Sequence, residues 1–448
     1  MKEKLLPDYE KIHDWELWSK NLKTEYRQCI DEGKDVEKYK DLFFAISNME
    51  NGEIKEKFAD VLFKLVEETG VRDGYKYVEP NDIDSIHKEC EGTGKKTECP
   101  KDEISDRVLG GWYGRICGCF LGKPIEGGTK EDIDSLLKAT GNYPISRYID
   151  KEDLKCDVPI RSFLKERLYP KDFGRMPVDD DTNYILIGYE ILKRYGRNFT
   201  SEDVMRVWLG TQVKDAYCTA ERIAFKNFVN GFLPPESAKY KNAYREWIGA
   251  QIRGDFFGYI NPGDPHSAAD MAFRDASMSH IKNGIYGEMW ASAMIAAAFT
   301  AGNVKDVIKA GLDEIPKNSR LHEAILRVIS DYENGVSSDE FFDDFHKRYN
   351  ECDPHDWCHT ISNAEIVAAS LLYGGGDYAK SICLAVSQGF DTDCNGATAG
   401  SVLGVLLGYK NLPTLWTERI NDTLESSLFG YTTVSVKEMA EKTLQFID

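Results

Sequence analysis

The stretch Gly110-Gly-Trp-Tyr-Gly-Arg-Ile-Cys-Gly-Cys-Phe-Leu-Gly122 carries a glycine at every fourth position, and a second series of the same spacing occupies residues 396–408. Residues four apart lie on one side of an α-helix. Glycine costs about 1 kcal/mol relative to alanine inside a helix. Eight such glycines therefore predict two buried helices whose backbones approach closely. Both segments are too short and too closely flanked by charge to span a membrane.

The rest of the chain supports a helical fold. Long apolar stretches with small residues recur after residue 104, at 290–301, 364–373 and 401–407, and no run of alternating residues indicates a sheet. We predict an all-α helical bundle over residues 104–448. Residues 1–103 are charged, with apolar positions at helical spacing followed by turn formers, and predict an N-terminal helical extension and linker.

Composition narrows the possible functions. Lys and Arg number 56 against 75 Asp and Glu, a formal net charge of −19, so the surface should repel nucleic acids and anionic membranes. The chain opens without an apolar signal segment and has no stretch of about 20 apolar residues, so we expect a cytoplasmic protein. His87, Cys90 and Cys99 complete no zinc pattern by their spacing, so no zinc site is predicted there.

Two acidic segments precede helices. Asp179-Asp-Asp-Thr182 stands before the helix expected at 183–195, and Asp391-Thr-Asp-Cys-Asn395 stands before the second glycine series. Either alone suits an ordinary helix N-terminus. If the fold brings them together, five carboxylates cannot all stay ionised without added positive charge. Oxygen donors favour Mg²⁺, with Mn²⁺ as the alternative, and the number of acids leaves room for two ions.

Three segments together resemble the ADP-ribosylglycohydrolase family, which includes the enzyme that reactivates dinitrogenase reductase. They are Gly114-Arg-Ile-Cys-Gly-Cys-Phe-Leu-Gly-Lys-Pro-Ile-Glu126, Asp179-Asp-Asp-Thr182 and Gly389-Phe-Asp-Thr-Asp-Cys-Asn-Gly396. Their order and spacing agree with the family over residues 104–448. The resemblance implies an all-α fold with a two-magnesium site and hydrolysis of an ADP-ribosyl glycosidic bond.

The resemblance also implies roles for individual residues. Asp180, Asp181 and Asp393 are expected to bind metal, Asp391 to serve the second ion, and Asp179 to occupy a position usually taken by a threonine ligand. Glu126 and Asp393 are expected to be catalytic. Two departures stand out: Cys394 replaces a Thr or Ser ligand, and Cys119 replaces an acid. A thiol is a poor partner for magnesium, so these positions leave the number of ions open.

Further residues are candidates for substrate binding. In the glycine- and proline-rich loop expected at 254–266, Tyr259 and Asn261 could cover a base. His280 could bind a phosphate, although a lone histidine is more often structural. His359 and Asn363 could face the sugar, with packing or helix capping equally open.

The favoured substrate is an ADP-ribosylated protein side chain or a small ADP-ribosyl compound. A simpler ribosyl compound such as a nucleoside is the alternative enzymatic substrate, because metals that bind ribose need not contact a diphosphate. A third hypothesis is a non-catalytic ADP-ribose-binding relative, against which the five aspartates and Glu126 argue. The sequence leaves the oligomeric state open.

Overall fold

Nearly all of the regular structure in the computed structural model is helical, as predicted. The structure describes residues 5–92, 94–155 and 174–447. Apart from isolated bridges, the β-structure in these ranges is one antiparallel pair of strands, β1 (Thr423–Glu425) and β2 (Thr433–Ser435). Within the same ranges, no helix combines the length and the apolar character needed to cross a membrane.

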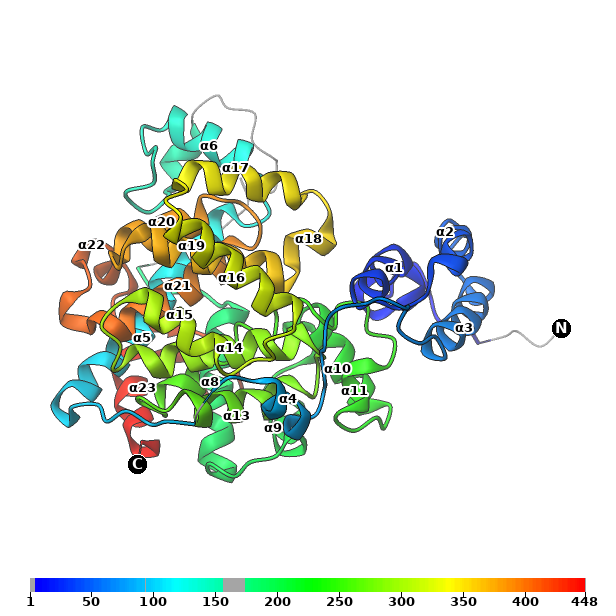
Figure 1. Ribbon diagram of the computed structural model, residues 1–448, viewed down its shortest axis with the longest axis horizontal. Coiled ribbons are helices and arrows are strands. Elements are labelled where there is room, and N and C mark those ends of the chain that lie inside the picture. The colour runs from blue at the N-terminus through cyan, green and yellow to red at the C-terminus, as the bar shows by residue number, and fades with distance from the viewer. Residues whose placement is uncertain (1–4, 93, 156–173, 448) are drawn as a thin grey trace.

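The helices fall into an N-terminal group, a linker helix and a large bundle (Figure 1). The N-terminal group contains α1 (Leu22–Asp31), α2 (Lys40–Ser47) and α3 (Glu53–Glu67), and the linker helix is α4 (Ile83–Glu89). The first half of the bundle contains α5 (Lys101–Gly122), α6 (Lys130–Ala139), α8 (Asp180–Tyr195), α9 (Ser201–Thr211), α10 (Thr219–Val229), α11 (Glu236–Lys239), α12 (Asp255–Tyr259), α13 (Pro265–Ala276) and α14 (Asn283–Ala298). The second half contains α15 (Val304–Leu312), α16 (Arg320–Glu333), α17 (Ser338–Arg348), α18 (Pro354–Cys358), α19 (Thr360–Gly374), α20 (Tyr378–Val386), α21 (Thr392–Leu407), α22 (Thr414–Thr417) and α23 (Val436–Thr443).

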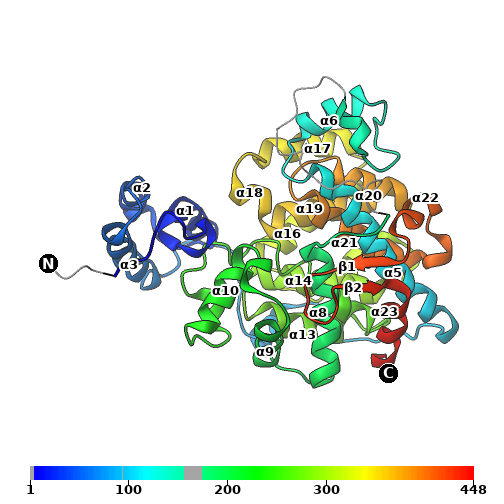
Figure 2. The ribbon, with the colours of Figure 1, turned by 180° about the vertical axis from the view of Figure 1, so that it is seen from behind.

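The two glycine series face each other across α5 and α21, which lie side by side in the bundle (Figure 2). A side chain at Gly114 would overlap the carbonyl oxygen of Gly400, and one at Gly400 would overlap the carbonyl oxygen of Gly114. Gly110 faces Gly404 and Gly118 faces Gly396 in the same way. The residue numbers of the facing glycines rise along α5 and fall along α21, so the two helices run antiparallel with their backbones in contact.

Buried helices surround this pair. All residues of α14 are buried, as are nearly all of α19, and both helices contact α21. Helices that are apolar on every side belong in the centre of a bundle. Their many small residues allow close packing, and the amphipathic helices α15 and α16 cover them on the outside.

The N-terminal group projects from one side of the bundle (Figure 1). It has a small core of its own, which includes Leu22, Phe43 and Leu62. Charged groups join it to the bundle: Arg245 donates to Glu25 at 2.8 Å and to Glu32 at 2.6 Å, and all three side chains are buried. The predicted division at residues 103 and 104 stays a prediction, although α5 begins close to it, at Lys101.

The glycine contact gives a direct test. In Gly400→Ala the added methyl group meets backbone atoms of α5, and such overpacking costs about 1–3 kcal/mol. We expect the free energy of unfolding to fall by at least about 1 kcal/mol, in spite of alanine's better helix propensity. Urea denaturation followed by circular dichroism measures this change.

Gly210→Ala is the matched control. Gly210 lies in helix α9 on the exposed surface, and the one atom within 4 Å of an added methyl group is the end of the Arg194 side chain, at 3.9 Å. Its stability should stay equal or rise by up to about 1 kcal/mol. Equal effects in the two variants would contradict the close-contact role of the glycines.

Candidate metal centre

The antiparallel pair of helices determines where the candidate residues lie. The end of α5 lies beside the start of α21, where the Thr392 hydroxyl donates to the Gly122 carbonyl at 2.9 Å. Lys123 and Glu126 follow α5 directly, and Asp391 and Asp393 begin α21. The glycine contact therefore brings the first and last parts of the bundle sequence to one place.

Arg115 attaches the other acidic segment to the same place. It projects from α5, is fully buried, and donates to the Asp181 carboxylate at 2.8 Å and to the Asp181 carbonyl at 2.9 Å. Its remaining terminal nitrogen donates to Asp255 on α12 at 2.8 Å. Arg115 thereby fixes the N-terminus of α8 against α5. The sequence interpretation missed this residue, although an arginine inside an apolar, glycine-lined helix must find buried partners.

The two acidic segments converge. One donor atom from each of Cys119, Asp179, Asp181 and Asp393 lies within 4.8 Å of the others. A second group with the same spacing contains Asp391, Asp393 and Cys394. Asp393 belongs to both groups, so the donors form one continuous centre with two adjoining positions.

Asp180 and Glu126 lie at the edge of this centre. Both are partly exposed, and Asp180 belongs to neither group of converging donors. The charge of Glu126 nevertheless acts on Asp180, Asp391 and Asp393. Glu126 is therefore close to both acidic segments and more accessible than the buried aspartates.

The carboxyl groups are poorly compensated. Burial, followed by the charges of neighbouring acids, raises the pKa of Asp180 to about 8 and that of Asp391 to about 6. Burial also raises the pKa of Asp393 and of Asp181 well above the usual range, the latter in spite of Arg115. Four carboxyl groups that resist ionisation in one place indicate a missing positive charge.

The donors fit a divalent cation. Asp181 Oδ2 and Asp393 Oδ1 are buried and accept no hydrogen bond from residues 5–92, 94–155 and 174–447, whereas buried carboxylate oxygens normally have a partner. Asp179 is less available, because it caps α8 by accepting from the Asp181 N–H at 3.0 Å and forms an ion pair with Lys123. One position thus offers these two carboxylate oxygens beside the Cys119 thiol, and the adjoining one includes the Cys394 thiol.

Two predicted substrate residues lie in the core. Tyr259 is fully buried, and its hydroxyl bonds to Ser401 at 2.7 Å. Asn261 is buried, donates to the Phe257 carbonyl at 2.8 Å and accepts from Arg197. The expected loop contains the short buried helix α12 in place of an open turn, because its aromatic residues pack inward. These positions do not support contact with a substrate.

The two histidines also have structural environments. His280 is fully buried, bonds to Ser279 at 2.8 Å, and has its pKa held well below the usual value by burial. His359 is buried and caps α19 by accepting from the Ile361 N–H at 3.1 Å. The capping interpretation therefore describes His359, and a phosphate could not reach His280 without rearrangement of the core.

Asn363 supports the centre from behind. Its side-chain oxygen accepts from the Asp391 backbone N–H at 3.3 Å and from the Asn395 side chain at 2.8 Å. Its amide nitrogen donates to the carbonyls of Trp357 and His359, each at 3.0 Å. Asn363 is buried and holds the second acidic segment in place, which agrees with the packing alternative left open for it and not with a sugar contact.

The fold and the centre define a helical protein whose buried carboxylates meet at the ends of tightly packed helices. The family model described as ADP-ribosylglycohydrolase matches residues 100–445, and the chain belongs to this family. Membership supports glycohydrolase activity on ADP-ribosyl-type substrates, in a family that is generally metal-dependent. A solved structure described as an ADP-ribosylglycohydrolase-related protein complex is 19% identical, with a TM-score of 0.48 over 77% of this chain and 98% of that chain. No curated protein matched the sequence.

Arg115→Met tests the link between the acidic segments. The substitution leaves Asp181 and Asp255 buried without their cation, and breaking a buried ion pair in this way costs about 3–5 kcal/mol. Arg115→Met combined with Asp255→Asn should recover part of that loss, because one of the two stranded charges is gone. Urea denaturation of both variants measures the difference. A loss below about 1 kcal/mol in the single variant would contradict the role of Arg115.

The raised pKa values predict a pH-dependent effect of metal on stability. In the metal-free protein the folded state binds a proton at Asp180 more tightly than the unfolded state does. The contribution of Asp180 to the free energy of unfolding therefore falls as pH rises from about 4, the ordinary pKa of an aspartate, to about 8. A cation that binds the ionised carboxylates should oppose the fall. We expect the rise in melting temperature caused by Mg²⁺ to be larger at pH 8 than at pH 6, and a pH-independent rise would count against this centre.

Proposed function

We propose that the protein is a Mg²⁺-dependent hydrolase of an ADP-ribosyl glycosidic bond, on a modified protein side chain or a small ADP-ribosyl compound. The observation that carries the proposal is a pair of buried carboxylate oxygens beside Glu126, Asp181 Oδ2 and Asp393 Oδ1, to which no described residue donates a hydrogen bond. These oxygens can bind a cation at the place where the Glu126 carboxylate can act on a substrate.

Asp181 and Asp393 would hold a cation at the first position, Asp391 and Asp393 would hold one at the second, and Asp180 would stand at the open side. When bound, magnesium supplies positive charge that orients ribose hydroxyls and polarises the sugar. Glu126 has the position for acid–base work, because it is partly exposed and adjoins both acidic segments. It would orient or deprotonate the attacking water, or stabilise the positive charge that develops on the sugar.

The number of ions follows from the donors. The position around Asp181 and Asp393 includes the Cys119 thiol, but its two carboxylate oxygens without a hydrogen bond from the described residues suit Mg²⁺. The position around Asp391 includes Cys394, and a thiol is a weak ligand for magnesium. We propose full occupancy at the first position and weaker Mg²⁺ binding at the second, where Mn²⁺ should bind better.

A simpler ribosyl substrate is the second candidate. Its supporting observation is that, among the described residues, both cations at the centre are already paired, Lys123 with Asp179. Arg115, the other cation at the centre, is fully buried and paired with Asp181 and Asp255. A diphosphate needs donors of its own, and these two side chains are engaged elsewhere. A nucleoside-like substrate would need the centre alone.

The activity is tested with purified protein and a panel of ADP-ribosylated arginine and serine compounds, O-acetyl-ADP-ribose and nucleosides, with and without Mg²⁺ or Mn²⁺. Metal-dependent release of ADP-ribose supports the first proposal, and release of ribose from nucleosides alone supports the second. Binding of ADP-ribose without turnover of any compound would indicate the non-catalytic alternative. Turnover that survives complete removal of divalent ions would contradict both enzymatic proposals.

Two substitutions separate the roles at the centre. Glu126→Gln should lower kcat by about 10²- to 10⁴-fold while Mg²⁺ still raises the melting temperature, because Glu126 is not assigned as a ligand. Asp393→Asn should lose both turnover and the metal-dependent stabilisation. Asp41→Asn, at an exposed position on α2, is the control and should change neither. Retention of metal-dependent stabilisation in Asp393→Asn would remove Asp393 from the ligand set.

A further inference from the structure

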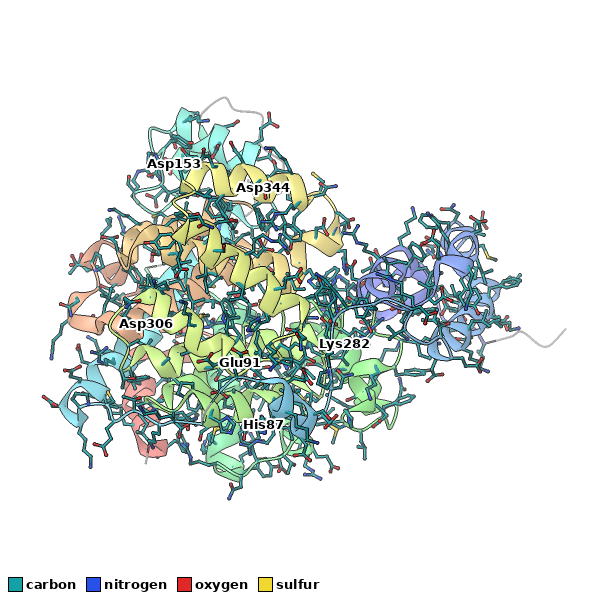
Figure 3. The ribbon with its side chains drawn as sticks, viewed as in Figure 1. His87, Glu91, Asp153, Lys282, Asp306 and Asp344 are labelled. Carbon is teal, nitrogen blue, oxygen red and sulfur yellow. The ribbon has the colours of Figure 1, made fainter. Side chains whose placement is uncertain are left out.

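Three side chains of types that can bind a metal, apart from the acidic centre, converge where the linker helix crosses the bundle. His87 projects from α4 (Figure 3), and His266 and Asp270 lie on α13. One donor atom from each residue lies within 4.8 Å of the others. None of the three belongs to the acidic centre, and all three are partly exposed.

The spacing of these donors suits a single ion. His266 and Asp270 are four residues apart, so they lie on the same face of α13. His87 Nε2 lies 2.8 Å from Asp270 Oδ1, and the rings of His87 and His266 have their centres 4.9 Å apart. Zinc ligands stand about 2.0–2.2 Å from the metal, so small side-chain rotations would place one cation between these atoms.

Glu314 prepares His266 for metal binding. Its carboxylate lies 2.8 Å from His266 Nδ1, and its side chain is 7% exposed. A proton on Nδ1 shared with Glu314 leaves the Nε2 lone pair free to bind a cation. Metal-binding histidines commonly bond a carboxylate through the other nitrogen in this way.

The charge of the group also favours a cation. Asp270 and Glu314 contribute two negative charges, and within the described ranges neither forms an ion pair with lysine or arginine. Cys90 ends α4 one turn after His87 and lies near both carboxylates. Two imidazoles, a carboxylate and a neighbouring thiol form a donor set that binds zinc more strongly than magnesium.

We propose that His87, His266 and Asp270 bind a zinc ion that fastens the linker helix α4 to α13. Water or Cys90 completes the coordination, since the partly exposed side chains leave one side open. The sequence hides this site because 183 positions separate His87 from Asp270. Its role is structural: it ties residues before the family match to the bundle, and it is independent of the function proposed above.

Zinc titration calorimetry tests the site in an Asp393→Asn background, which weakens binding at the acidic centre. Adding His87→Gln and His266→Gln should lower the stoichiometry by one equivalent of Zn²⁺ and abolish the zinc-dependent rise in melting temperature. His13→Gln is the matched control, because His13 is exposed in the N-terminal segment and belongs to none of the groups of converging donors. It should change neither quantity.

Zinc K-edge X-ray absorption on the Asp393→Asn protein with His355→Gln, which removes one histidine of the converging group Asp31, His355 and His359, provides a test that does not depend on how the His87 and His266 variants fold. Scattering from two imidazoles is the expected result. Unchanged zinc stoichiometry in the histidine variants, or a spectrum without imidazole scattering, would overturn the proposal. His87 would then join α4 to α13 only through Asp270, and His266 would join α13 to Glu314, which follows α15.

Discussion

The contact between α5 and α21 is the constraint on which the rest of the structure depends. Glycine at each facing position lets the backbones touch, and a methyl group at any of them would strike a carbonyl oxygen. Each glycine lowers helix stability by about 1 kcal/mol, but it allows the two backbones to approach closely. The end of α5 meets the start of α21, and a residue near position 120 becomes the neighbour of one near position 390.

Electrostatics explains why this meeting point is suited to chemistry. The N-termini of α8 and α21 present backbone N–H groups that favour negative charge, yet their aspartates exceed what two helix ends and two cations can balance. Arg115 takes one oxygen of Asp181, and Lys123 takes one of Asp179. Asp181 Oδ2 and Asp393 Oδ1 remain buried and receive no hydrogen bond from the part of the chain that the structure describes. Such an arrangement weakens the metal-free protein and is stable with a bound cation.

Periodic features of the sequence gave reliable predictions, and features that depend on tertiary contacts did not. The glycine spacing predicted the central helix pair, and the resemblance of the acidic segments to the family, rather than their composition, implied a common centre. Arg115 was visible as a charge in an apolar helix, but its partners Asp181 and Asp255 could be known only from the fold. Tyr259 was assigned to a loop because glycine and proline surround it, whereas burial of its ring placed it in the core. His87 has partners too distant in sequence for any spacing rule.

Polar contacts connect the N-terminal group to the acidic centre, so the two are not independent units. His355 Nε2 lies 2.9 Å from Asp31 of α1, and α18, which carries His355, leads directly into α19. Asn363 on α19 then bonds the backbone of Asp391. Buried polar contacts of this kind define one arrangement more than they add stability. The extension therefore supports, through α18 and α19, the same acidic segment that α5 positions from the other side.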